Sequence, residues 1–107
     1  MVYCDMDIGD QAGAFLDALY EWMKAQNARI TASGDPDAPK DHYVMMTLLG
    51  KLRALGNDFG HWQAYCEAAT RLTAGYKKHL KQNGHYGAPI VGSAERFIGE
   101  LLRRMAP

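Results

Sequence analysis

The chain has 107 residues, of which 48% are hydrophobic and 22% charged, and this composition indicates one soluble globular domain rather than a disordered tail. Its 12 basic and 12 acidic side chains give a formal net charge of zero. A protein that binds nucleic acid through its overall charge is expected to be basic, so the net charge gives no support to that class of protein. Two cysteines are too few for a disulfide scaffold, the start of the chain lacks a secretory pattern, and no stretch approaches the ~18 apolar residues of a membrane span. These features predict a cytoplasmic protein with no membrane segment.

The first predicted helix covers about residues 10–29 and follows a short acidic tail, residues 1–9. Helical spacing places its apolar side chains on one face, which comprises Phe15, Leu16, Leu19, Trp22 and Met23. Asp10, Asp17 and Glu21 fall on the opposite side. We expect Asp10 to cap the start of this helix.

The second predicted helix covers about residues 39–55, after a loop with two prolines, a glycine and two aspartates. Asp37 followed by Pro39 is typical of a helix start, because the first turn tolerates proline. The apolar face of this helix comprises Val44, Met45, Leu48, Leu49, Leu52 and Leu55. Gly56 is expected to adopt the left-handed conformation that ends a helix.

The third predicted helix, expected to be the longest, covers about residues 58–82 and has Asn57–Asp58 as its cap. Gly60 and Gly75 are expected to weaken it by roughly 1 kcal/mol each. Its inward face comprises Phe59, Trp62, Cys66, Ala69, Thr73, Tyr76 and Leu80. After a glycine-rich linker, Ser93 is expected to cap a fourth helix over about residues 93–105.

The pattern predicts an all-α fold in which a compact antiparallel bundle of four main helices forms a single domain over residues 1–107. Nowhere do apolar and polar residues alternate as in a half-buried strand. The predicted core comprises Phe15, Leu19, Trp22, Met45, Leu48, Leu52, Trp62, Cys66, Ala69, Phe97, Ile98 and Leu101.

The residues offer no constellation for catalysis, a metal or a cofactor. The acidic start of the chain lacks the glycine and glutamate of a calcium loop, and no two of the four histidines have the spacing of helical zinc ligands. The glycine-rich linker lacks the lysine of a phosphate-binding loop. Cys66 is predicted to be buried away from any base. We therefore expect no catalytic residues, no cofactor and no enzymatic activity.

Charge is unevenly distributed, and this asymmetry carries the functional hypotheses. The acidic line on the first helix can dock on a basic surface that normally binds nucleic acid. The bases of the third helix, with aromatic residues near its end, can form a protein interface or bind single-stranded nucleic acid, or can be a solvated face. The candidate partner-binding residues are Asp10, Asp17, Glu21, Arg71, Tyr76, Lys77, Lys78, Lys81, His85 and Tyr86.

A short all-α chain with opposed charge faces and no catalytic constellation resembles the small phage-encoded anti-CRISPR proteins. The resemblance covers the whole chain in size and helical type and names no residue. It implies stoichiometric binding to a subunit of a type I surveillance complex or to its nuclease. DNA capture or cleavage would then be blocked without chemistry.

The leading hypothesis is a non-catalytic protein-binding module, in its sharpest form a phage or mobile-element inhibitor that occludes a surface of a host defence complex. The alternative is a helical protein that binds nucleic acid through the basic face of the third helix. A further alternative is a structural subunit of a helical assembly, with Tyr3, Tyr20, Tyr43 and Tyr86 as contacts. A homodimer is also possible, with Met46 as a candidate contact.

Overall fold

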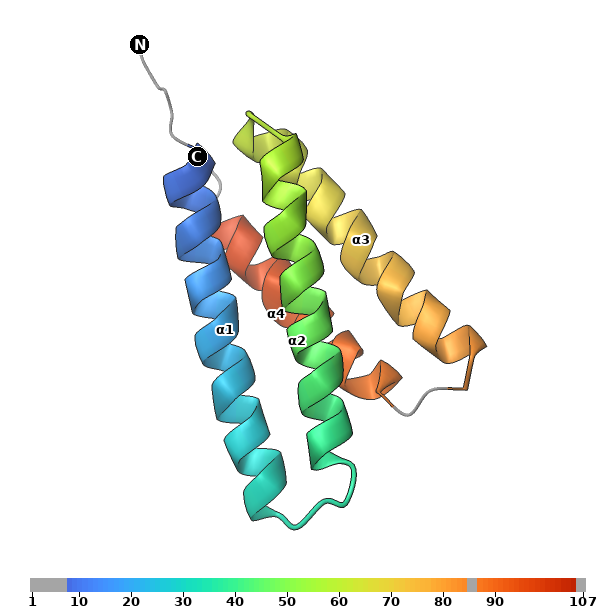
Figure 1. Cartoon of the computed structure of the whole chain (residues 1–107). Coiled ribbons are helices and arrows are strands. Elements are labelled where there is room, and N and C mark those ends of the chain that lie inside the picture. Colours follow the sequence, from blue (N-terminus) through green and yellow to red (C-terminus); the bar gives the residue numbers. More distant parts are fainter. Residues whose placement is uncertain (1–7, 85–86, 106–107) are drawn as a thin grey trace.

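The computed structural model describes residues 8–84 and 87–105, with side chains from Asp10 onward, and shows an all-α bundle. Its helices are α1 (Ile8–Ala32), α2 (Ala38–Leu55), α3 (Trp62–Gln82) and α4 (Ala88–Met105), and a 3₁₀ turn, η1 (Gly56–Asp58), follows α2. The first three helices alternate in direction, and α4 crosses behind them (Figure 1). The described part of the chain has no strand, so the predicted fold class is confirmed.

Packing is unequal among the helices. The pairs α1–α2 and α3–α4 are in more extensive contact than α2 and α3, and the bundle measures 51 × 28 × 20 Å. Figure 1 shows α1 and α3 on opposite sides of α2. The thinner contact between α2 and α3 leaves a groove on that side of the molecule.

An aromatic cluster fills the end of the core where α1, α2 and α3 meet. Phe15 meets the rings of Trp62 and Tyr65 edge-on at 6.3 and 6.0 Å, and Trp62 stacks on Tyr65 at 5.5 Å. Tyr65 is fully buried, and its hydroxyl donates a hydrogen bond of 2.9 Å to the carbonyl oxygen of Leu52. This bond satisfies a phenol that burial would otherwise leave without water.

Most of the predicted core is buried, with three corrections. Trp22, Cys66 and Phe97 are only half-buried, because each lies at the flank of its helix's apolar face. Trp22 and Phe97 stack on each other at 5.1 Å between α1 and α4. Met46, the candidate dimer contact, is half-buried and packs against the core on one side. The confirmed core residues are Phe15, Leu19, Met45, Leu48, Leu52, Trp62, Ala69, Ile98 and Leu101.

The starts of three helices differ from expectation. Because α1 begins at Ile8, Asp10 lies in its first turn and is not its cap. The cap of α3 is His61, whose Nδ1 accepts a hydrogen bond from the amide of Ala64, while Asn57 and Asp58 lie in η1.

The fourth helix starts at Ala88, so Ser93 is inside it. Proline at its second position suits a first helical turn, which is why the glycine-rich linker is shorter than predicted. Gly60 precedes α3 and cannot weaken it, and α1, with 25 residues, is longer than α3, with 21.

Glycine in the left-handed conformation follows α1 and α3, but Gly56, which was predicted to adopt it after α2, does not. Gly56 has a φ of −59°, because η1 continues the right-handed backbone beyond α2. Gly34 has a φ of +79°, and the hydrogen bonds from its amide to Thr31 and from Asp35 to Ile30 form a Schellman motif. Gly84, with a φ of +64°, follows the end of α3.

Substituting alanine at Gly34 and at Gly50 is expected to change stability in opposite directions. Gly34→Ala forces a Cβ into the left-handed region and should lower the free energy of unfolding by about 1 kcal/mol. Gly50 is exposed inside α2 with nothing within 4 Å of a Cβ, so Gly50→Ala should raise it by up to about 1 kcal/mol. Urea denaturation followed by circular dichroism measures both, and changes of the same sign would contradict this account.

Candidate functional site

The acidic residues of α1 form one continuous line. Asp10, Asp17 and Glu21 are all exposed and lie within about 40° around the helix axis. Glu21 forms an ion pair of 3.1 Å with Lys24 one turn further on. These three acidic residues are called the acidic stripe below.

The bases of α3 do not act as one group. Arg71, Lys78 and Lys81 are exposed, and they are called the basic stripe below. Lys77 is half-buried and forms an ion pair with Glu95 of α4, so its charge is neutralised within the molecule. The bridge joins residues 18 apart in sequence, which is why periodicity along α3 could not separate Lys77 from its neighbours.

The predicted aromatic partners of these bases are not beside them. Tyr76 is half-buried and faces α2 rather than the basic stripe. His85 and Tyr86 lie outside the described residues, as does Tyr3. The structure therefore brings no described aromatic ring of the candidate set onto the basic stripe.

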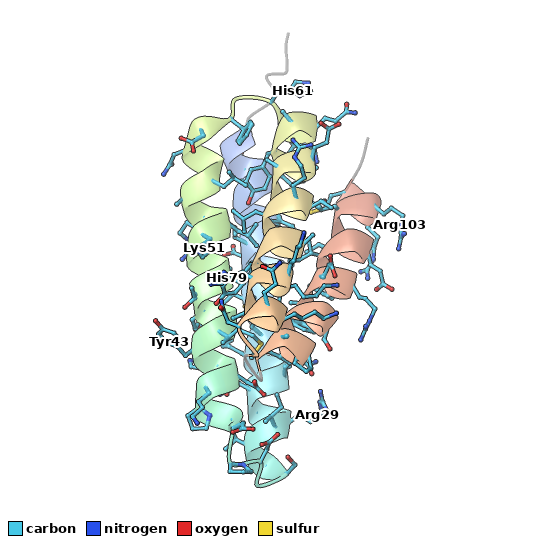
Figure 2. All side chains as sticks on the ribbon, turned by 90° about the vertical axis from the view of Figure 1, so that its right-hand side faces the viewer. Arg29, Tyr43, Lys51, His61, His79 and Arg103 are labelled. Atoms are coloured by element: carbon cyan, nitrogen blue, oxygen red, sulfur yellow. The ribbon has the colours of Figure 1, made fainter. Side chains whose placement is uncertain are left out.

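An open groove of about 860 Å³ lies between α2 and α3. Figure 2 shows Lys51 and His79 near each other where these helices meet, and Tyr43 at the outer edge of α2. Tyr43 is 71% exposed, which makes it the most exposed large hydrophobic side chain of the described residues. The groove is lined by Tyr43, Val44, Thr47, Lys51, Ala54, Leu55, Asp58, Leu72, Tyr76, His79 and Leu80.

Polar contacts hold the middle of the groove in place. The Thr47 hydroxyl donates to the carbonyl oxygen of Tyr43 at 2.9 Å. The ammonium group of Lys51 lies 5.7 Å from the centre of the Tyr76 ring, a cation–π arrangement. Burial raises the pKa of the Tyr76 hydroxyl, while its side-chain hydrogen bond with Thr47 acts in the opposite direction. The groove therefore presents the ammonium group of Lys51, the carboxylate of Asp58, the phenol of Tyr76, which is neutral at neutral pH, and the exposed ring of Tyr43.

Sequence reasoning missed this groove as a site. Of its lining, only Tyr76 was a candidate partner-binding residue, and Tyr43 was named only as a possible subunit contact. A signal was present, since Tyr43, Thr47 and Lys51 recur every four residues and so lie along one flank of α2. What α2 faces along that flank could not be known without the tertiary structure.

The described residues show neither a metal-binding cluster nor an activated thiol. They contain no cluster of three or more histidine, cysteine or acidic side chains that could hold a metal ion. Burial raises the pKa of the Cys66 thiol and the Glu67 carboxylate adds to that rise, so the thiol remains protonated and unreactive at neutral pH. The lining of the groove offers aromatic, apolar and charged side chains for binding.

Comparison with family models, with curated proteins and with solved structures finds no match to this chain. Among the described helices, none combines the length and the hydropathy that crossing a membrane requires.

Proposed function

We propose that this chain is a non-catalytic protein-binding module whose main binding surface is the groove between α2 and α3. The observation that carries the proposal is the exposure of Tyr43, whose large aromatic side chain is 71% exposed at the edge of the groove. A second tyrosine, Tyr76, and the lysine Lys51 lie in the wall of the same groove. Tyrosine is enriched among the residues that dominate binding energy at protein interfaces. Grooves between helices commonly accept an amphipathic helix of a partner.

The more specific version of this proposal is that the chain inhibits a host defence complex, as the anti-CRISPR proteins do. Its support is the resemblance in size and helical type. Occluding a partner's surface requires only a folded scaffold and a binding face, both of which a rigid four-helix bundle can supply.

The nucleic-acid alternative has less support. The ion pair of Lys77 with Glu95 leaves three bases on the exposed face of α3, and Tyr76 is turned away from them. Three phosphate contacts give weak binding, because affinity for nucleic acid depends on the number of counterions released.

A pull-down with matched variants tests the groove. The tagged wild type, Tyr43→Ala, Lys51→Glu and Arg103→Glu are incubated with nuclease-treated bacterial lysate, and the captured proteins are quantified by mass spectrometry. Arg103 is exposed on α4, away from the groove, and serves as the charge-reversal control. We expect one protein to be held by the wild type and the control, and to fall at least tenfold with either groove variant.

An equal yield of that protein with all four baits would contradict the groove as the binding surface. Circular dichroism of each variant should match the wild type, because all three substituted side chains are exposed. The identity of the protein that passes this comparison then tests the inhibitor hypothesis.

A further inference from the structure

We propose that a second copy of this chain docks through its acidic stripe onto the basic stripe of the first. This surface is separate from the groove, so the inference does not depend on the proposed function. Of the six charges involved, five form no ion pair within the described residues, and Glu21 is paired only with its neighbour Lys24. Both stripes are thus free to meet charges on another molecule.

The two stripes match in spacing. Asp17 follows Asp10 by seven residues and Glu21 follows by four more, whereas Lys78 follows Arg71 by seven and Lys81 follows by three more. At a rise of 1.5 Å per residue, the first interval is about 10.5 Å on both helices, and the second is about 6 Å against about 4.5 Å. When the helices lie parallel, Asp10 faces Arg71, Asp17 faces Lys78 and Glu21 faces Lys81.

Small residues occupy the same place within each stripe. Gly13 and Ala14 lie between Asp10 and Asp17, and Ala74 and Gly75 lie at the same offsets between Arg71 and Lys78. Nothing lies within 4 Å of a Cβ built on either glycine, so packing inside the molecule does not require glycine at these helical positions. Small side chains allow two helices to approach closely, which brings the flanking charges within reach of one another.

The topology supplies the parallel orientation. Figure 1 shows that α1 and α3 both descend on opposite sides of α2, with α3 inclined to α1. A neighbouring copy displaced sideways and tilted by that inclination, without being turned over, therefore sets its α1 alongside α3 of the first copy. Because the two surfaces differ, the contact is heterologous, and further copies add in the same way to form short open chains.

The contact between the two stripes is expected to be weak, because its charged side chains are exposed to solvent. Isolated exposed ion pairs are weak and are screened by salt, and Lys24 competes for Glu21. The association should therefore be visible only at high protein concentration and low ionic strength. Asp17 and Lys78 lie in the middle of the contact, so reversing their charges is the most informative substitution.

Sedimentation equilibrium of a reciprocal charge swap tests the proposal. The wild type, Asp17→Lys, Lys78→Glu, an equimolar mixture of these two variants, and the control Arg103→Glu are compared up to about 1 mM protein, in about 20 mM and about 500 mM salt. At low salt we expect the mean mass of the wild type and of the control to rise above the 11.9 kDa of one chain by at least half. In high salt it should return to that value.

Each stripe variant alone should stay at 11.9 kDa, because like charges then meet in the middle of the contact. The mixture should regain the association of the wild type, since the lysine that replaces Asp17 in one variant faces the glutamate that replaces Lys78 in the other. A wild type that stays monomeric at low salt would overturn the proposal. So would stripe variants that associate as the wild type does, or a mixture that fails to recover.

Discussion

Replacing Phe15 with alanine is expected to lower the free energy of unfolding by about 3–5 kcal/mol. Phe15 has no exposed surface, and its ring meets those of Trp62 and Tyr65 edge-on. The substitution removes these aromatic contacts and leaves a cavity that helices on three sides cannot fill. For a domain of this size such a loss is a large share of the total stability, which is typically about 5–15 kcal/mol.

Urea denaturation followed by circular dichroism at 222 nm measures this effect. Tyr20→Ala is the matched control, because Tyr20 belongs to the same helix and is 39% exposed. It should cost less than about 1 kcal/mol, as surface substitutions usually do. Equal losses for the two variants would show that the aromatic cluster is not the centre of the core.

Alkaline pH is expected to destabilise the protein through Tyr65. Burial, with a smaller contribution from the neighbouring Cys66, raises the pKa of the Tyr65 hydroxyl from 10.0 to about 12. In the unfolded chain this phenol loses its proton near pH 10, while in the folded protein it remains neutral. Its contribution to stability is therefore complete below pH 10 and is lost as the pH rises from 10 to 12. This rise in the pKa of Tyr65 corresponds to a loss of roughly 3 kcal/mol in the free energy of unfolding.

The comparison of wild type with Tyr65→Phe isolates this effect, because other groups titrate in the same range. The variant loses the hydrogen bond to the carbonyl oxygen of Leu52 and should be less stable by about 1 kcal/mol at pH 7. Between pH 10 and 12 the wild type should lose roughly 3 kcal/mol more than the variant does. Parallel stability curves for the two proteins across this range would contradict the assignment.

The groove and the two stripes depend on different parts of the fold. The groove lies where α2 and α3 are in less extensive contact than the pairs α1–α2 and α3–α4, and its wall combines residues from both α2 and α3. The stripes lie on the outer faces of α1 and α3 and require only that each helix be straight and exposed there. A partner in the groove and a second copy on the stripes therefore occupy separate surfaces, and the variants that test one leave the other unchanged.

The amino-acid sequence by itself determined the features that repeat within one helix. The apolar face that buries Phe15 and Leu19, and the line from Asp10 to Glu21 opposite it, both follow from a period of 3.6 residues. The loop between α1 and α2 could also be predicted from local sequence, because proline restricts the backbone and glycine widens its range of conformations at the positions where they stand. Helix starts were harder, since Ala88 and Trp62 begin helices where better capping residues stand nearby.

Only the tertiary structure decided which faces meet. It paired Lys77 with Glu95, joined Tyr65 to Leu52, and set Tyr43 and Lys51 of α2 opposite Tyr76 of α3. Each of these contacts joins residues at least 13 positions apart in the chain, and none has a local signature. Their geometry depends on how four apolar faces pack together at once, which is a property of the assembled bundle and not of any single helix.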